Sequence, residues 1–330
     1  MKAILIDEPG PPSALYVGEA ERPEIGEKEI LVRIEAAGVN RADAMQREGL
    51  YPPPLGASPI LGLEMAGKVE EAGSACSKFQ KGDSVFALLA GGGYAEYVAV
   101  DERLALPIPE NMDFVKAAGI AEVFLTAYQA LRWLAGIEKG NKVLIHAGAS
   151  GVGTAAVQLV RYFDCSAIVT VGSTQKLEFC KSLGAAFATN YREEKFVDSV
   201  KRFTNNRGVD IILDFIGGDY FDRNLECLAP DGCLVMLALL GSKELRGVDV
   251  SKVLLKRLKI IGSTLRNRSL DYKVRLVKAF EKDCYKGFMT GELQPIIDRT
   301  VPFDEATDAH EYLEANRTMG KVILTGSLLA

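Results

Sequence analysis

Apolar and polar residues follow two different periods along this chain. Up to about residue 120, the apolar runs are short and are separated by turns that carry proline and glycine, which is typical of β-strands. Helical periodicity is nearly absent before Val115. The first part of the chain therefore predicts a β-rich domain, built as a partly open barrel or as two packed small sheets. The runs that predict its strands lie at residues 2–6, 29–37, 66–72, 84–89 and 94–100.

The period changes at about residue 123. A helix is predicted over residues 124–134, and short apolar runs then alternate with amphipathic stretches of helical length. Such alternation predicts a parallel, doubly wound α/β sheet, and six strands make a complete dinucleotide-binding fold. The predicted strands lie at residues 143–147, 167–171, 209–214, 233–238 and 258–262, with a weaker one at 187–189.

The last segment predicts long helices over residues 270–288 and 304–317 and a closing strand at 321–324. Because this segment is too short for a core of its own, we expect it to return and complete the β-rich domain. A chain of 330 residues is long enough for two domains. The predicted organisation is one domain of residues 1–122 and 266–330 with a second domain, 123–265, inserted into it. A ligand cleft is expected where the domains meet.

A strand, a tight turn and a helix are predicted over residues 143–159. The turn carries Gly148, Ser150 and Gly153, a variant of the G-x-G-x-x-G dinucleotide motif, with Gly151 added. A helix that begins near Ser150 would direct its free amide groups at a pyrophosphate, and the serine hydroxyl would donate to a phosphate oxygen. The alternative is that these glycines allow a tight turn and nothing more.

The residues after the next predicted strand indicate which nicotinamide cofactor is bound. Ser173 and Lys176 follow that strand, and no Asp or Glu stands where the ribose of NAD would be recognised. A hydroxyl and a lysine suit a 2′-phosphate, so the pattern favours NADP(H). The alternative is that Ser173 caps the following helix and Lys176 is a solvated helix residue.

Two loops of the β-rich domain are candidates for substrate contact, residues 37–43 and 49–56. Three prolines stiffen the second loop and hold Tyr51 at its edge. A phenol in such a place can donate to a carbonyl oxygen and can stack its ring against a substrate. The alternative is a surface tyrosine that packs on the proline rings.

Charge and composition limit the classes of partner that the protein is expected to bind. The formal net charge is −5 and both signs are interspersed, which argues against nucleic acid or an anionic membrane as the main partner. We expect no apolar run of membrane-spanning length, and the acidic start is unlike a secretory leader, so a cytoplasmic location is expected. The six cysteines are scattered and predict free thiols.

Six dispersed segments together resemble the medium-chain dehydrogenase/reductase superfamily over essentially the whole chain. Within it they are similar to the zeta-crystallin-type quinone oxidoreductases, most closely to the tumour-suppressor-inducible branch. The resemblance implies a GroES-like catalytic domain with an inserted Rossmann domain. The segments are residues 39–43, 51–54, 60–64, 88–93, 145–153 and 313–316.

The resemblance also implies that no metal is bound. Zinc-dependent members place Cys where Asn40 stands and His where Leu63 stands, and Glu64 alone cannot hold zinc. Glu64 is then either a general base or, as we favour, paired with an Arg or Lys. His146 is expected to be a core imidazole and His310 to lie on a helix face, with neither acting as a catalyst.

The resemblance implies roles for residues on both sides of the predicted cleft. Tyr51 would contact a quinone oxygen, and Asn40 would lie near the same pocket. Tyr191 would lie beside the phosphoribose, Leu240 and Leu265 near the nicotinamide, and Asn316 at the substrate-side edge. Ser150, Gly151, Val152 and Gly153 would meet the pyrophosphate, and Ser173 and Lys176 the 2′-phosphate.

The sequence therefore predicts a zinc-independent NADPH:quinone oxidoreductase, which reduces quinones by hydride or net one-electron transfer. One alternative is an NADPH-dependent enone or enal double-bond reductase. An alternative of another class is an NADPH-binding structural or RNA-binding protein without turnover. The resemblance implies a homodimer, which the outer sheet segments 232–240 and 258–262 could form, and the sequence leaves a tetramer open.

Overall fold

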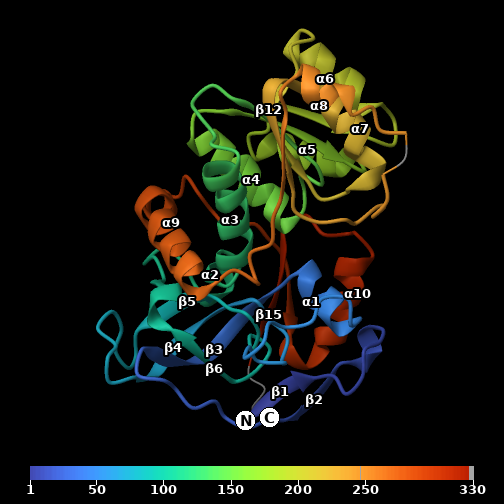
Figure 1. The fold of residues 1–330 in the computed structure, drawn as a ribbon. Coiled ribbons are helices and arrows are strands. Elements are labelled where there is room, and N and C mark those ends of the chain that lie inside the picture. The colour runs from blue at the N-terminus through green and yellow to red at the C-terminus, as the bar shows by residue number, and fades with distance from the viewer. Residues whose placement is uncertain (246, 327–330) are drawn as a thin grey trace. The chain divides into compact units, whose positions relative to one another are not determined.

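The computed structural model describes residues 1–245 and 247–326, so the last four residues of the predicted range 266–330 lie outside the described part. The chain forms two compact units, which Figure 1 shows. The first unit combines Met1–Leu125 with Leu265–Ala330, and the second unit is Thr126–Thr264. In Figure 1 the first unit combines the blue and teal beginning of the chain with its orange-red to red end, and the second unit is green to light orange.

The first unit is built on a seven-stranded sheet. Its order is β14-β15-β3-β4-β5-β7, with β6 also paired to β3. All pairs are antiparallel except β14 with β15, which is parallel. A separate antiparallel pair joins β1 and β2. The strands are β1 Lys2–Leu5, β2 Tyr16–Glu19, β3 Glu29–Val39, β4 Glu64–Ala72, β5 Ser84–Leu88, β6 Tyr97–Asp101, β7 Ala105–Pro107, β14 Ile297–Pro302 and β15 Lys321–Thr325.

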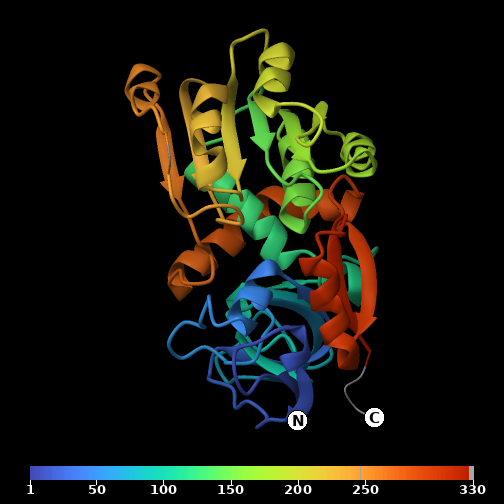
Figure 2. The same ribbon diagram turned by 90° about the vertical axis from the view of Figure 1, so that its right-hand side faces the viewer.

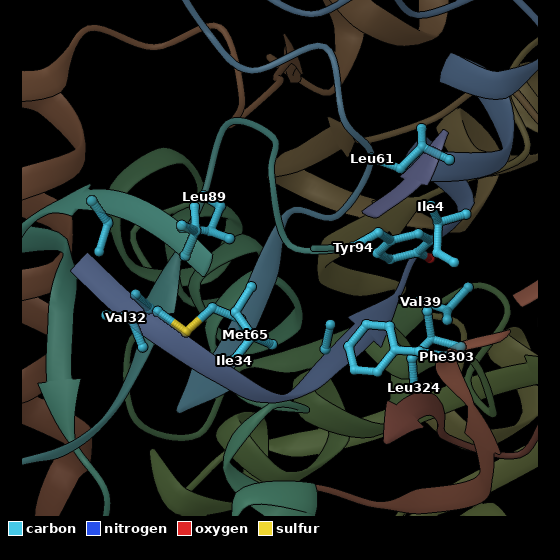
Figure 3. Packing of buried hydrophobic residues seen from close by; sticks show 14 of the residues in the cluster. Ile4, Val32, Ile34, Val39, Leu61, Met65, Leu89, Tyr94, Phe303 and Leu324 are labelled. Carbon is cyan, nitrogen blue, oxygen red and sulfur yellow. The ribbon is translucent and has the colours of Figure 1, made fainter. Parts of the chain in front are cut away.

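Strand β3 is central to this sheet and is buried along most of its length, because β4 lies on one side and β6 and β15 on the other. Its branched side chains Val32, Ile34 and Val39 pack in one core with Met65 of β4 and Leu324 of β15 (Figure 3). Residues nearly 300 positions apart in the sequence thus share a core. The C-terminal segment therefore belongs to the β-rich unit.

The helices of the first unit are short except for α9. They are α1 Arg41–Arg47, α2 Phe114–Ala117, α9 Leu270–Thr290 and α10 Ala306–Glu314, and α3, Ala121–Tyr128, runs from this unit into the second. Helix α9 begins after Ser269, whose hydroxyl accepts from the Tyr272 amide, and ends at Gly291 with φ 79°. Serine at the start and a left-handed glycine at the end are the expected signals for a helix of this length.

Several elements of the first unit differ from the prediction. The stretch 37–43, predicted as a loop, holds the end of β3 and the beginning of α1, where Asp43 accepts a hydrogen bond from the Asn40 amide at 2.8 Å. This Asn-x-x-Asp contact satisfies an amide at the helix start and makes a helix of seven residues possible. Strands β2, β7 and β14 were not predicted, because they are short or largely polar.

The second unit has the predicted six-stranded parallel sheet, in the order β10-β9-β8-β11-β12-β13. Order reverses between β8 and β11, and ligands of such sheets bind outside the carboxyl ends at this point. The strands are β8 Lys142–Ile145, β9 Ser166–Val171, β10 Phe187–Asn190, β11 Val209–Asp214, β12 Leu228–Met236 and β13 Lys259–Gly262.

Helices cover both faces of this sheet, as Figure 2 shows. Right-handed crossovers place α4 and α5 on one face and α6 and α7 on the other, because the strand order reverses between them. Phe196, Val200, Leu225 and Leu234 form part of the core between the sheet and the second pair. The helices are α4 Gly151–Tyr162, α5 Thr174–Ser182, α6 Phe196–Thr204, α7 Gly218–Cys227 and α8 Ser251–Leu255.

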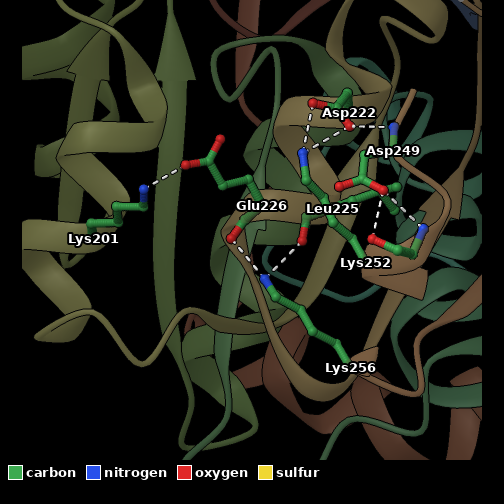
Figure 4. A network of polar contacts seen from close by, with 8 residues as sticks. Lys201, Asp222, Leu225, Glu226, Asp249, Lys252 and Lys256 are labelled. Atoms are coloured by element: carbon green, nitrogen blue, oxygen red, sulfur yellow. Dashed lines mark hydrogen bonds and ion pairs between the residues drawn. The ribbon is translucent and has the colours of Figure 1, made fainter. Parts of the chain in front are cut away.

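Hydrogen bonds from two lysines connect the short helix α8 to α7. Figure 4 shows the Lys252 ammonium donating to both carboxylate oxygens of Asp222, at 2.8 and 2.7 Å. The Lys256 ammonium donates to the carbonyl oxygens of Leu225 and Glu226, each at 2.9 Å, at the end of α7. These bonds satisfy carbonyls that have no partner within the helix.

The predicted helix 124–134 is present in altered form, as α3 followed by a π-helical segment, Gln129–Leu134. The stretch Phe114–Leu134 contains an 18-residue window with a mean hydropathy of 1.2 and is, by length and composition, long and apolar enough to cross a membrane. This corrects the expectation that no stretch reaches that length. However, 72% of its most apolar window is buried inside the structure, as in a core helix.

Candidate active site

The turn after β8 has the geometry of a phosphate-binding turn. Ser150 is the N-cap of α4, and its hydroxyl oxygen accepts from the Gly153 amide at 3.1 Å. Gly151 and Val152 form the first turn of this twelve-residue helix. The amides of that turn have no partner within the helix, so they can bind an anion placed above the carboxyl end of β8.

Two glycines allow the strand and the helix to approach closely. A Cβ on Gly153 would lie 2.4 Å from the carbonyl oxygen of Ala147, and a Cβ on Gly148 would lie 2.6 Å from the Cβ of Val169. Neither position accepts a larger residue without a backbone shift. Glycine at both positions therefore lets the helix begin close to the end of the strand. Dinucleotide-binding turns require this close approach.

The structure brings three of the predicted cofactor residues together at the next two strand ends. Ser173 follows β9 and caps α5, and its hydroxyl oxygen accepts from the Lys176 amide at 3.3 Å. Tyr191 follows β10, and its amide donates to the carbonyl oxygen of Val171 at 3.0 Å. Its phenol oxygen would lie 2.7 Å from a Cβ on Gly172. The capping role that we considered for Ser173 is thus present, and it leaves the hydroxyl proton available to donate.

Leu240 and Leu265 lie in different units. Leu240 follows β12, is about half exposed, and donates its amide to the carbonyl oxygen of Phe215 at 2.9 Å. At the neighbouring end of β11, the buried Asp214 accepts from the Ile216 amide at 2.8 Å, and burial raises its pKa to about 6. Leu265 is buried in the first unit.

In the first unit, Asn40, Glu64 and Lys321 form a compact buried cluster, named here the Lys321 cluster. The Lys321 ammonium lies 2.7 Å from Oε1 of Glu64 and donates to Oδ1 of Asn40 at 2.7 Å and to the Val39 carbonyl oxygen at 2.8 Å. The side-chain amide nitrogen of Asn40, Nδ2, donates to the same Glu64 oxygen at 3.0 Å. The expectation that Glu64 pairs with a cation is confirmed. Sequence analysis did not identify Lys321, which lies 281 positions from Asn40.

Tyr51 is held on its loop by Arg266. The Arg266 guanidinium lies over the phenol ring, 5.4 Å from its centroid, and donates to the Tyr51 carbonyl oxygen at 3.3 Å. The Arg266 guanidinium also donates to the carbonyl oxygen of Ala90 at 2.8 Å and to the side-chain oxygen Oε1 of Gln46 at 2.7 Å. Burial and the Glu122 carboxylate raise the pKa of Tyr51, while Arg266 lowers it. The phenol therefore stays protonated near neutral pH and can donate a hydrogen bond.

Glu122, in the first turn of α3, is a further residue that sequence analysis missed. Its amide donates to Oε2 of Glu64 at 2.8 Å, which connects α3 to the Lys321 cluster. Burial, followed by repulsion from Glu64, raises the pKa of the Glu122 carboxyl to about 8, and Lys321 opposes this shift. The carboxyl is therefore largely protonated at neutral pH.

Asn316 lies away from the Lys321 cluster, at the end of α10. It adopts φ 54°, is exposed, and accepts a hydrogen bond from the Arg41 guanidinium at 3.0 Å. Arg41 also donates to the Leu313 carbonyl oxygen at 3.0 Å. These contacts connect α1, which Asn40 begins, to the end of α10.

Both histidines are buried and engaged, as expected for His146. Its Nε2 faces Oδ1 of Asn224 at 2.7 Å, and its Nδ1 faces the Thr170 hydroxyl at 2.9 Å. Burial lowers the pKa of His146 to about 4 and that of His310 to about 3. His310 lies between Arg47 and the Tyr94 hydroxyl, each at 3.2 Å. Both imidazoles are neutral near pH 7.

The residues around Glu64 do not fit a catalytic zinc ion. The Lys321 ammonium already contacts both Glu64 and Asn40, and a cation beside it would be repelled. Within residues 1–245 and 247–326, no three His, Cys, Asp or Glu side chains gather as a metal site would require. The donor set is one carboxylate and one amide oxygen.

Two family models match the chain. The alcohol dehydrogenase GroES-like domain matches residues 26–110, and the zinc-binding dehydrogenase model matches residues 151–282. Human quinone oxidoreductase is 30% identical over 98% of this chain and 97% of its own length. A GroES-like unit together with a six-stranded parallel sheet is the architecture of medium-chain dehydrogenases/reductases. The chain belongs to the quinone oxidoreductase family of that superfamily.

Solved structures agree with this assignment. The quinone oxidoreductase of Escherichia coli complexed with NADPH is 29% identical, with a TM-score of 0.87 over 99% of this chain and all of its own. The CurK enoyl reductase is 28% identical, with a TM-score of 0.87 over 98% of both chains. The predicted fold class, an α/β chain with a GroES-like domain and an inserted six-stranded Rossmann domain, is confirmed.

Proposed function

We propose that this protein is an NADPH-dependent quinone oxidoreductase that works without bound zinc. The Lys321 cluster carries the proposal, because a fixed ammonium stands beside the carboxylate that a metal would need. Without a Lewis acid to stabilise an alkoxide, alcohol oxidation is disfavoured, whereas a quinone accepts hydride readily. Similarity to the human and Escherichia coli quinone oxidoreductases supports the same substrate class.

The second unit is proposed to bind NADP(H), with the predicted domain boundary of residues 123–265. Ser150, Gly151, Val152 and Gly153 would hold the pyrophosphate at the start of α4. Ser173 and Lys176 would hold the 2′-phosphate, and Tyr191 would lie beside the phosphoribose. The shared position of these residues at the ends of β8, β9 and β10 supports the proposal. When bound, NADPH supplies the hydride.

The first unit, residues 1–122 and 266–330, is proposed to bind the quinone. Tyr51 would donate a hydrogen bond to a quinone oxygen, and Arg266 would keep its ring in place. Asn40 would help to line the same site. Leu240 and Leu265 would contact the nicotinamide, and Asn316 would border the substrate. Positioning and hydrogen bonding are then the contributions of the protein to the reaction.

Similarity to CurK favours a second candidate, reduction of an activated carbon–carbon double bond. Both reactions need only a positioned acceptor and a hydrogen-bond donor. NADPH oxidation should be measured with a panel of quinones and of enones and enals. Faster turnover of quinones supports the first function, and turnover of enals with inertness towards every quinone refutes it. Binding of NADPH without any turnover would favour a structural role.

We further propose that two copies form a homodimer through β13. This strand is at the sheet edge, and the adjoining segment exposes apolar residues that a monomer would leave in water. They are Val250, Leu254, Leu255 and Ile260. A two-fold axis would pair the two edges. The mixed charge supports a cytoplasmic protein without a nucleic-acid or membrane partner.

A further inference from the structure

Within the described part of the chain, the Glu122 carboxyl has no direct partner, although the nearby Glu64 and Lys321 are both engaged. Its side chain is largely buried but keeps some contact with solvent. Among the described residues, none donates a hydrogen bond to this carboxyl or forms an ion pair with it. The neighbouring Glu64 carboxylate, by contrast, accepts from Asn40 and from the Glu122 amide and is paired with Lys321. Glu122 is thus available for contact with a ligand.

Charged groups from four elements act on the Glu122 carboxyl. Glu64 of β4 and Asp43 of α1 repel its ionised form, while Lys321 of β15 and Lys273 of α9 attract it. Tyr51 and Arg266 lie within electrostatic range from their loops. The three donors of the Lys321 ammonium are already used by Val39, Asn40 and Glu64. Lys321 therefore cannot bond Glu122 without leaving its cluster.

Lys273 is the other group of this region that lacks a direct partner. Its side chain is 7% exposed, and burial lowers its pKa while Glu122 raises it. Across the described chain, no carboxylate lies within ion-pair distance of its ammonium. The Glu122 carboxyl and the Lys273 ammonium attract each other without forming an ion pair, and Glu122 lies within electrostatic range of the Tyr51 phenol. Such a set of polar groups is suited to an oxygen-bearing ligand.

We propose that Glu122 is the proton donor that completes quinone reduction in this protein, a role that rests on the proposed function. The quinone accepts a hydride, two electrons and one proton, from NADPH and becomes a hydroquinone monoanion. The O–H bond of the Glu122 carboxylic acid breaks, and its proton forms the second O–H bond of the hydroquinone. Lys273 stabilises the carboxylate that is left, and solvent returns the proton.

The first test measures the protonation of Glu122 without cofactor or substrate. Infrared difference spectra between about pH 7 and pH 9.5 should show loss of a carboxylic acid C=O band, because the pKa of Glu122 is about 8. The Glu122→Gln variant should lack this band. The Glu110→Gln variant, which changes an exposed carboxyl of the same unit, should retain it. A wild-type spectrum without the band overturns the proposal.

The second test compares two quinones in the same variant. An alkylated quinone gives a basic hydroquinone anion that needs a donated proton, whereas a halogenated quinone gives an anion that is stable at neutral pH. Glu122→Gln should lower kcat about 100-fold for the alkylated quinone and by less than about threefold for the halogenated one. Equal losses for both would indicate a structural role and contradict the proposal. Glu122→Asp should restore part of the selective loss.

The outcomes separate this proposal from the function on which it rests. If the wild-type protein fails to oxidise NADPH whichever quinone is supplied, the proposed function fails. If the wild type turns over and Glu122→Gln matches it with both quinones, only the role of Glu122 fails. The solvent isotope effect on kcat of the wild type needs no variant. It should exceed about 2 with the alkylated quinone, and a value of 1 contradicts proton donation in the rate-limiting step.

Discussion

The ammonium of Lys321 lies 2.7 Å from Oε1 of Glu64, and the two side chains are 3% and 0% exposed. Two buried opposite charges stabilise each other only when their remaining hydrogen-bonding groups are satisfied. Here Asn40 bonds both partners, and Val39 takes the remaining lysine donor. A covalently attached cation thus stands beside the carboxylate in place of an exchangeable ion.

Removing one partner of this pair should destabilise the protein strongly. Lys321→Met leaves Glu64 buried without its counter-charge, which we expect to lower the free energy of unfolding by about 3–5 kcal/mol. Adding Glu64→Gln removes the uncompensated charge and should recover part of the loss. Urea denaturation measures both. The exposed pair Lys81–Glu70 is the control, and Lys81→Met should lower the free energy of unfolding far less than Lys321→Met does. Equal small losses at both sites would contradict a buried pair.

Lys176 should determine the preference for NADPH over NADH. Lys176→Glu replaces a cation near the proposed 2′-phosphate by an anion, and we expect about a 10- to 100-fold loss of NADPH affinity, with NADH changed by less than about threefold. Fluorescence titration of each cofactor measures this. Lys181→Glu changes an exposed lysine of the same helix and should leave both affinities as they are. Similar losses for the two cofactors would refute the 2′-phosphate assignment.

The raised pKa of Glu122 predicts an unusual pH dependence of stability. Between its ordinary value of 4.5 and its folded value of about 8, the folded protein keeps a proton that the unfolded chain has released. The unfolded state binds fewer protons, so this group makes the free energy of unfolding fall as pH rises, by at most about 1.4 kcal/mol per pH unit.

The Glu122→Gln variant lacks this effect, so its stability relative to the wild type should increase from about pH 5 to pH 8 and then level off. His146 and His310, whose pKa values are lowered to about 4 and 3, act with the opposite sign below about pH 6.5. Their contribution is the same in both proteins and cancels in the difference. Urea denaturation across this range checks the prediction, and a flat difference would show that Glu122 ionises normally.

A lysine introduced at the edge of the parallel sheet should prevent self-association of the protein. Ile260→Lys places an ammonium on β13, where pairing with a second copy would bury it, so the variant should be monomeric. Light scattering after size exclusion gives the mass. Met289→Lys, at an exposed position of α9, should leave the dimer intact. A wild-type protein with the mass of one chain would contradict the proposed dimer.

Much of the fold follows from sequence because its signals are local. The apolar runs predicted all six strands of the parallel sheet, and Gly148 and Gly153 marked the turn that begins α4. Helix α1 was missed although Asn40 and Asp43 carry the spacing of a capping pair. A helix of seven residues shows too little apolar periodicity to be predicted from that pattern. The Asn40–Asp43 capping spacing is therefore the signal that could have predicted α1.

The Lys321 cluster was only partly predictable. Sequence indicated that Glu64 pairs with a cation, but no pattern could identify Lys321, because the pairing depends on β15 returning beside β3. Glu122 carries no motif, and its raised pKa results from burial and from Glu64, which are properties of the fold. Lone charged residues in apolar segments, such as Glu122 before Val123, are the signal that could have marked it.

The central claim is that hydride passes from NADPH to a quinone with no zinc ion in the protein. The most direct measurement is the rate of quinone-dependent NADPH oxidation in chelator-treated protein whose zinc content is determined on the same sample. The account predicts an undiminished rate when zinc is far below one ion per chain. A rate that falls in proportion to zinc content, and returns when zinc is restored, would contradict it.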